Sequence, residues 1–172
     1  MRLETERLIL VPLSIEYFKL YLEDRSKMEK NLGVEITGEK TSAEKKKIFQ
    51  KPYEQAKKDR KNHLWHTHWQ VISKDENRIV CGITFKGVPN NKGEVEIGYG
   101  TRVGFQNRGY MTETVKKLSQ WALTQKDVKW VVAETNIDNI ASQKVLEKSG
   151  FERFKIDSES YWYKIAKSVN VD

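Results

Sequence analysis

Residues 94–113 read EVEIGYGTRVGFQNRGYMTE, and this stretch decides the fold. Its first part, residues 94–101, alternates in the manner of a β-strand, and residues 109–125 repeat apolar side chains at helical spacing after a polar loop. Backbone N–H groups at a helix start have no partners within the helix, and the helix dipole adds positive potential there. Gly109 has no Cβ to keep an anion away from the backbone. We therefore expect a phosphate or pyrophosphate to bind at this loop.

Outward from this stretch, hydrophobic periodicity and turn residues predict an alternation of strands and helices. The predicted strands are residues 7–13, 65–73, 78–88, 94–101 and 128–135, with a closing hairpin of 151–156 and 161–165. The predicted helices are residues 14–23, 41–61, 109–125 and 138–149, and residues 24–40 are predicted to be irregular. Pro52 is expected to kink or split the second helix, and Gly150 to end the last one with Phe151 packed against its final turn.

This order of elements predicts an α+β (mixed α/β) fold built on one twisted sheet. The early strands follow one another through turns and are expected to pair antiparallel. A helix then connects strand 94–101 to strand 128–135, and such a crossover makes these two strands parallel. Because ligands bind where strand order changes in this way, we expect the site between these two strands.

Length and composition fit one domain that spans residues 1–172. With 38% hydrophobic and 10% aromatic residues the chain can bury a core, and a mean hydropathy of -0.71 indicates a well-solvated surface. No apolar run is long enough for a membrane span or a signal peptide, so we expect a cytoplasmic protein. The single cysteine, Cys81, excludes an internal disulfide and a cysteine-based zinc cluster, and its context is that of a small buried hydrophobe.

The net charge of +7 is concentrated in residues 40–61, where nine basic residues outnumber three acidic ones. The basic residues are Lys40, Lys45, Lys46, Lys47, Lys51, Lys57, Lys58, Arg60 and Lys61. Such a run on a predicted helix is most simply a solvated face. If this segment borders a substrate-binding site, its charge favours an acidic peptide or an acidic small molecule as the substrate. Binding to RNA or the ribosome ranks below both, because no recognised module with interleaved aromatic residues accompanies the charge.

Three stretches of the chain resemble the GNAT acetyltransferase superfamily. Residues 106–111 (QNRGYM) are similar to its acetyl-CoA loop, in which Gln or Arg and two further residues precede Gly, one residue and then Gly or Ala; Met111 stands at that last position. Residues 4–10 (ETERLIL), together with NIAS (139–142) and VLEKSGF (145–151), resemble the RimJ/RimL-like branch, the ribosomal-protein N-terminal acetyltransferases and their small-substrate relatives. The resemblance implies the GNAT acyl-CoA N-acyltransferase fold, a mixed and mostly antiparallel sheet with helices on both faces and a splayed parallel strand pair.

The resemblance also implies acetyl-CoA as the co-substrate and assigns the residues that bind it. The backbone of residues 99–101 would pair with the pantetheine arm, and residues 107–112 would hold the pyrophosphate. Asn139 matches a residue that hydrogen-bonds the cofactor arm, and Ser142 matches one near the sulfur. The candidate cofactor-binding residues are therefore Tyr99, Gly100, Thr101, Gln106, Asn107, Arg108, Gly109, Tyr110, Met111, Thr112, Asn139 and Ser142.

The implied reaction is direct acetyl transfer to a primary amine, at a protein N-terminus or on a small molecule, within a ternary complex. It needs a base for the amine and a donor for the developing oxyanion. Glu96 and Glu134 are the candidate bases, with Glu96 preferred, and Glu94 stays open because a bulge changes which residues face the cleft. An unpaired strand N–H near Tyr99 is the candidate oxyanion donor.

The leaving thiolate also needs a proton. Some relatives place a Tyr seven residues after the Asn for this purpose, and Leu146 occupies that position here. Ser142 is the candidate catalytic residue beside the sulfur, with water or Tyr110 as the proton source. The missing Tyr supports a second hypothesis, a CoA-binding sensor module without catalysis.

Other features indicate no further cofactor. His66 and His68 would share one face of a predicted strand, but no third ligand is near, so aromatic packing is preferred over zinc and no metal is expected. The expected partners are acetyl-CoA and an amine acceptor. No membrane is expected, nucleic acid is disfavoured and a homodimer is left open.

Overall fold

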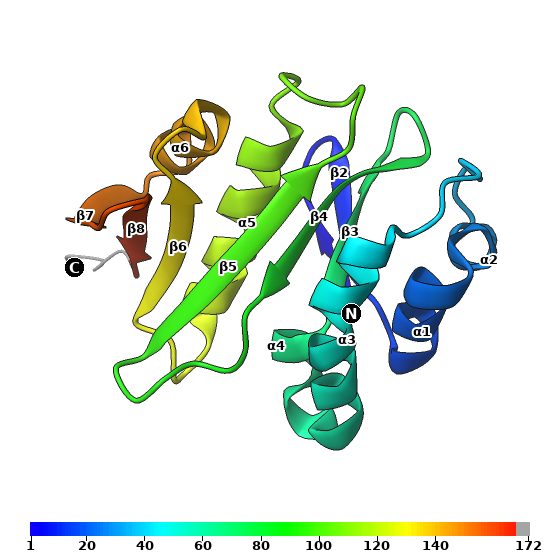
Figure 1. Cartoon of the computed structure of the whole chain (residues 1–172), viewed down its shortest axis with the longest axis horizontal. Coiled ribbons are helices and arrows are strands. Elements are labelled where there is room, and N and C mark those ends of the chain that lie inside the picture. Colours follow the sequence, from blue (N-terminus) through cyan, green and yellow to red (C-terminus); the bar gives the residue numbers. More distant parts are fainter. Residues whose placement is uncertain (168–172) are drawn as a thin grey trace.

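The computed structural model describes residues 1–167 and contains one eight-stranded sheet in the order β1-β2-β3-β4-β5-β6-β8-β7 (Figure 1). The strands are β1 (Leu3–Glu4), β2 (Leu8–Pro12), β3 (His68–Ser73), β4 (Arg78–Phe85), β5 (Glu94–Thr101), β6 (Trp130–Asn136), β7 (Glu152–Ile156) and β8 (Ser160–Ala166). Strands β5 and β6 are parallel, and the other neighbouring strands are antiparallel. The predicted fold class is confirmed.

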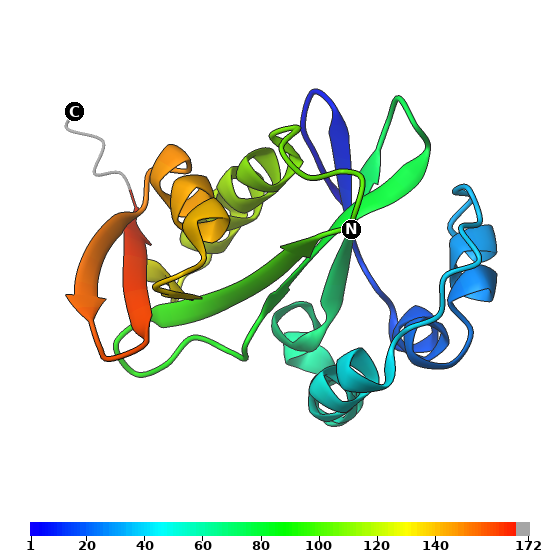
Figure 2. The same cartoon turned by 45° about the horizontal axis from the view of Figure 1, so that its top comes forward.

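Helices cover both faces of the sheet, as Figure 2 shows. They are α1 (Ile15–Glu23), α2 (Arg25–Asn31), α3 (Ala43–Lys58), α4 (His63–His66), α5 (Tyr110–Thr124) and α6 (Ile140–Lys148), with a 3-10 turn η1 (Arg60–Asn62) before α4. Helices α5 and α6 lie on one face, here called the α5 face. Helices α1, α2 and α3 lie on the other, here called the α3 face. The short helix α4 directly precedes β3, and its Leu64 and Trp65 pack against the α5-face core.

Each side of the sheet has its own hydrophobic core. Alternation along β5 directs Val95 and Ile97 to the α5 face, where they join the buried α5 residues Val115 and Leu118. The core of the α3 face contains Phe18 and other residues of α1, α2 and α3. The remaining alternate residues of β5 therefore face the α3 side, and these are Glu94, Glu96, Gly98 and Gly100.

Helix α2 corrects the prediction that residues 24–40 are irregular. Its sequence, RSKMEKN, offers one apolar side chain and so shows no helical periodicity. The Asp24 side chain caps it by accepting a hydrogen bond from the Lys27 N–H at 3.1 Å. Met28 and Glu29 are both buried, and Glu29 pairs with Arg102, far along the chain. Long-range contacts, rather than local pattern, hold this helix.

Pro52 does not split α3, which runs continuously from Ala43 to Lys58. The lost backbone hydrogen bond is offset by packing on both sides of the proline. Before it, Phe49 lies edge-on to Phe18, with 6.3 Å between ring centroids, and after it Tyr53 does the same at 5.6 Å. Tertiary packing therefore outweighs the local preference.

The strand predicted at residues 65–73 begins later than expected. Residues 63–66 form α4, in which the Thr67 N–H donates to the His63 carbonyl at 2.9 Å, and β3 begins at His68. His66 and His68 consequently do not share a strand face, and the prediction that they would is wrong. His68 instead stacks on Tyr21 at 4.9 Å, which is the aromatic packing preferred for it.

The end of α6 follows the prediction. Gly150 adopts a φ of 87°, in the left-handed region that favours glycine. Its N–H donates to the Glu147 carbonyl and that of Phe151 to the Leu146 carbonyl, both at 3.0 Å. Phe151 is buried against the α5-face core, so the helix is closed by both hydrogen bonds and an apolar contact.

Candidate active site

Strands β5 and β6 pair only near their beginnings. Their register runs from Glu94 opposite Trp130 to Ile97 opposite Ala133, and the strands then diverge towards their carboxyl ends (Figure 1). Residues 98–101 keep their pairing with β4 on the other side. The structure therefore contains the splayed parallel pair, and within residues 1–167 the far edge of residues 98–101 has no strand partner.

The alternation of hydrogen bonds shows which backbone groups face this opening. The Lys86 N–H donates to the Glu96 carbonyl at 2.8 Å, and the Arg102 N–H donates to the Val80 carbonyl at 3.0 Å. Even-numbered residues of β5 therefore exchange hydrogen bonds with β4. The N–H and C=O groups of Tyr99 and Thr101 point the other way, into the gap, where an extended ligand with amide groups can pair with them.

Helix α5 begins beside the same opening. Its N-cap, Gly109, has a φ of 78° and supplies no side chain to cap the helix, so the N–H groups of the first turn are free of side-chain caps. Asn107 also has a positive φ, 60°. Gln106, Asn107 and Arg108 are exposed. This arrangement is the predicted anion site, with N–H donors and the positive end of a helix dipole at one place.

Tyr110 and Met111 turn their side chains away from this helix start and into the α5-face core. The Tyr110 hydroxyl donates to Glu76 Oε1 at 3.3 Å, and Arg108 pairs with the same oxygen at 2.8 Å. Since the Met111 side chain is buried, its replacement of a small residue leaves the helix start open. Tyr110 and Met111 can therefore contribute to anion binding only through their backbone N–H groups.

Residues 4–10, near the start of the chain, hold the loop before α5 in place through side-chain contacts. Arg7 Nη2 lies 2.7 Å from Glu113 Oε2 in the first turn of α5, and Arg7 Nη1 donates to the Arg108 carbonyl at 3.1 Å. The Thr5 hydroxyl donates to the same carboxylate. Burial raises the pKa of Glu113, but the hydrogen bonds from Thr5 and Arg7 outweigh it and the net shift is downward.

Sequence reasoning missed Arg7 and Glu113 as positioning residues. The available signal was an acidic residue in the first turn of a helix that lacks a side-chain cap, since such a residue needs a partner when it is partly buried. The partner lies more than a hundred residues away, and no local pattern identifies it.

Ser142 and Tyr99 meet across the opening. The Tyr99 hydroxyl lies 2.9 Å from Ser142 Oγ. Burial raises the pKa of Tyr99 to about 12, and the hydrogen bond with Ser142 acts in the opposite direction. Asn139 caps α6, because its Oδ1 accepts from the Ser142 N–H at 3.0 Å. This capping bond uses the amide oxygen of Asn139 and not its nitrogen.

The candidate bases lie on the α3 face. Glu96 is partly shielded and its carboxylate pairs with Lys86. Glu134 is exposed and directly follows Ala133, the last residue of β6 that pairs with β5. Beyond Glu96, this face of β5 carries only Gly98 and Gly100. A Cβ built on Gly100 would meet no atom of residues 1–167 within 4 Å. The surface between Glu96 and the open edge at Tyr99 is therefore glycine backbone without β5 side chains.

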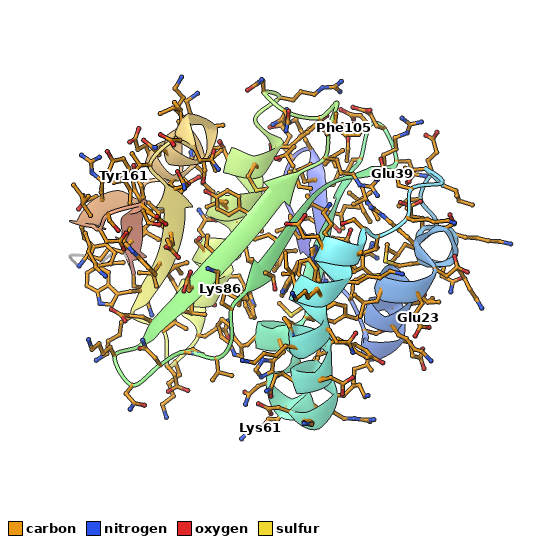
Figure 3. All side chains as sticks on the ribbon, viewed as in Figure 1. Glu23, Glu39, Lys61, Lys86, Phe105 and Tyr161 are labelled. Carbon is orange, nitrogen blue, oxygen red and sulfur yellow. The ribbon has the colours of Figure 1, made fainter. Side chains whose placement is uncertain are left out.

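A cavity of about 1000 Å³ lies between α3 and the α3 face of β3, β4 and β5. Gly98 and Gly100 form part of its floor, and Phe49 and His68 form part of its wall. A second cavity of about 410 Å³ is lined by Glu94 and Glu96. Lys86 borders both cavities and lies over β5 in Figure 3.

Cys81 also lines the large cavity, but its thiol is buried. Burial raises the pKa of Cys81 to about 11, so the thiol is protonated at neutral pH and is a poor nucleophile. Among residues 1–167, no group of three or more His, Cys, Asp or Glu residues could hold a metal ion. The same described residues include no helix long and apolar enough to cross a membrane.

Comparison with known proteins identifies the family. Residues 7–152 match the acetyltransferase (GNAT) domain, and the chain belongs to the GNAT acetyltransferase family. The uncharacterized N-acetyltransferase YjdG of Bacillus subtilis (strain 168) is 34% identical over 151 residues, which cover 87% of this chain and 88% of that protein.

Solved structures share the fold at lower identity. The ribosomal-protein-S5-alanine acetyltransferase of Vibrio fischeri has a TM-score of 0.67 at 16% identity, over 96% of both chains. The ribosomal L7/L12 α-N-protein acetyltransferase RimL in complex with coenzyme A has a TM-score of 0.67 at 16% identity, over 96% of this chain and 98% of that chain. The fold and family expected from the sequence are confirmed.

Proposed function

We propose that this protein is an acetyl-CoA-dependent N-acetyltransferase of the RimJ/RimL-like branch that acetylates a primary amine by direct attack in a ternary complex. The observation that carries the proposal is the free edge of β5 beside the uncapped start of α5. The free edge of β5 suits the extended, amide-containing pantetheine arm of acetyl-CoA, and the start of α5 suits the pyrophosphate of the same molecule. We also propose that residues 1–172 form one domain and that the protein acts in the cytoplasm.

The backbone supplies most of the proposed co-substrate site. Tyr99 and Thr101 would pair with the pantetheine arm, and residues 107–112 would surround the pyrophosphate. Asn139 would donate its free side-chain N–H to the arm. The complex of RimL with coenzyme A, a protein of the same fold, supports this assignment.

The acceptor amine would reach the acetyl group from the α3 face. The N–H of Tyr99 points into the gap and would stabilise the developing oxyanion. Glu96 would take the proton from the amine through water that crosses the surface of Gly98 and Gly100. Glu134, at the mouth of the gap, is the alternative base.

The proton for the leaving thiolate would come from water. Leu146 is fully buried, and because its side chain has no ionisable group this position supplies no acid. Tyr99, with a pKa of about 12, holds its proton too strongly to give it up to a thiolate whose usual pKa is roughly 8.5. Tyr99 and Ser142 would therefore hold the sulfur by hydrogen bonds without giving up a proton. Tyr110 would not supply the proton either, because its hydroxyl donates to Glu76.

Thermal unfolding with and without acetyl-CoA tests the proposal without knowledge of the acceptor. Saturation at about 100 times the Kd should add roughly 2.7 kcal/mol to the free energy of unfolding. For a chain of this size that is a rise in Tm of about 5–10 °C. Adenosine, which lacks the pyrophosphate and the pantetheine arm, serves as the control ligand. No rise in Tm at millimolar acetyl-CoA contradicts the proposal.

Substitution of Glu96 tests the base. Glu96→Gln should keep the Tm shift with acetyl-CoA and lower kcat by about 10²-fold, because the carboxylate would act only on the amine. Glu152→Gln, at an exposed position of β7, is the control. Glu94→Gln tests the remaining candidate base, two residues earlier on the same face of β5. If Glu134→Gln lowers kcat and Glu96→Gln does not, the base is Glu134. Binding of acetyl-CoA without turnover of any amine favours the sensor hypothesis.

A further inference from the structure

Residues that line the large cavity on the α3 face carry most of the unpartnered buried polar atoms of the described chain. Residues 1–167 hold six such side-chain atoms, and four belong to residues that line this cavity. They are Arg25 Nε, His68 Nδ1, Gln70 Nε2 and Arg102 Nε. Buried polar groups are nearly always hydrogen-bonded, so this concentration points to a missing partner.

Three of these four atoms can only donate. An arginine Nε and an amide nitrogen have no acceptor role, and their natural partners are oxygen atoms. Arg25 and Arg102 have side chains only 6% and 10% exposed. Arg25 Nε lies 3.4 Å from Glu29 Oε1 without forming a hydrogen bond to it. The missing partner is therefore rich in acceptor oxygens.

The charges that line the cavity have one sign. Its cationic residues are Arg25, Lys45, Lys51, Lys86 and Arg102, and no Asp or Glu is among the lining residues. Three of the cations are paired with carboxylates outside the lining, Glu29 or Glu39 for the two arginines and Glu96 for Lys86. Lys45 and Lys51, on α3, make no ion pair within residues 1–167.

His68 also lines the cavity, and its ring carries no charge at neutral pH. Burial, with smaller contributions from the charges of Arg25 and Lys45, lowers the pKa of His68 to about 3. His68 is therefore neutral at neutral pH. The same cations would favour the neutral form of an entering amine, which is the form that attacks a thioester.

We infer that the amine acceptor carries a second, anionic oxygen group, a carboxylate or a phosphate, which binds between Arg25 and Lys45 while the amine lies over Gly98 and Gly100. This inference rests on the proposed acetyl transfer and names the class of its substrate. Only two lysines of the basic segment 40–61, Lys45 and Lys51, line the cavity. The remaining basic residues of that segment therefore take no direct part in holding the anion.

Four dipeptides with the same N-terminal amine, each amidated at its C-terminus so that no α-carboxylate is present, test the inference: Ala-Glu, Ala-phosphoserine, Ala-Gln and Ala-Lys. CoA release should give a kcat/KM for Ala-Glu or Ala-phosphoserine that exceeds that for Ala-Lys by about tenfold or more. A higher value for Ala-Glu identifies a carboxylate site, and a higher value for Ala-phosphoserine a phosphate site. Equal values for all four peptides, or a preference for Ala-Lys, overturn the inference while leaving acetyl transfer intact.

Lys45→Gln and Lys46→Gln form a matched pair on α3, because both side chains are exposed and only Lys45 lines the cavity. Lys45→Gln should reduce the preference for the anionic peptide, measured as the ratio of kcat/KM for Ala-Glu to kcat/KM for Ala-Gln, by about three- to tenfold. Lys46→Gln should keep the wild-type preference. An equal loss in both variants indicates general attraction by the helix and contradicts a defined site.

Calorimetry separates failure of the inference from failure of the proposed reaction. If no peptide yields CoA, the binding of Ala-Glu and Ala-Lys to the unliganded protein is compared directly. Tighter binding of Ala-Glu that is weakened by Lys45→Gln supports the anion site even though the reaction is then wrong. Equal binding of the two peptides overturns the site.

Discussion

Replacement of Gly109 by glutamate is expected to abolish the binding of acetyl-CoA. Gly109 precedes the free N–H groups of α5 at a φ of 78°, and a Cβ there would lie 3.4 Å from Arg7 Nη2. A carboxylate at this place repels phosphate and competes with Glu113 for Arg7. We expect Kd to rise by about 100-fold or more, which corresponds to roughly 2.8 kcal/mol. The Tm rise with acetyl-CoA should disappear.

Two controls separate charge from backbone strain. Gly109→Lys places similar bulk at the same φ with the opposite charge, and it should retain more affinity than Gly109→Glu. Gly33→Glu introduces the same residue at a φ of 71°, where a Cβ meets no described atom within 4 Å. It should lower Tm without changing the shift with acetyl-CoA. If Gly109→Glu binds acetyl-CoA as the wild type does, the anion site is not at this loop.

Replacement of Glu29 by glutamine should give the largest loss of stability. The Glu29 side chain is fully buried and accepts hydrogen bonds from Arg102 Nη2 at 2.9 Å and from the Thr37 N–H at 2.8 Å. It is also the buried counter-charge of Arg25. Removing one charge from such a group leaves buried guanidinium groups uncompensated, at a cost of about 3–5 kcal/mol. Tm should fall by roughly 6–20 °C.

Thermal unfolding of three variants checks this expectation. Glu23→Gln, which removes an exposed i,i+4 partner of Lys19 on α1, should change Tm by less than about 2 °C. The double variant Glu29→Gln with Arg102→Gln should recover part of the loss, since it also removes a stranded charge. A Glu29→Gln protein as stable as the wild type indicates that Arg25 and Arg102 reach solvent without Glu29.

Gly109→Glu and Glu29→Gln affect different sites on opposite faces of the sheet. Gly109 belongs to the site where the co-substrate is proposed to bind, on the α5 side of the splayed strands. Glu29 supports the wall of the proposed acceptor cavity, since its partners Arg25 and Arg102 line that cavity. Loss of Glu29 also leaves the cavity more cationic, so any folded Glu29→Gln protein should prefer anionic acceptors more strongly.

Local patterns were sufficient for the part of the chain that carries the proposed chemistry. Alternation in residues 94–101, the loop before Gly109 and the apolar stripe of α5 are all set by neighbours in sequence, so the strand, loop and helix could be predicted. The parallel partner strand followed from the crossover rule. Met111 shows the limit, because only the packed core reveals that its side chain turns away from the helix start.

The sequence by itself determined the order of the elements, the fold class, the family resemblance and the position of the proposed anion site, because each depends on residues close together in the chain. The tertiary structure alone decided that Arg7 holds Glu113, that Pro52 stays within a continuous helix and that α2 forms around Glu29. It also decided that residues from α2, β3 and the end of β5 that carry unpaired donors line one cavity. These features depend on contacts between distant segments, which exist only once the sheet has brought the segments together.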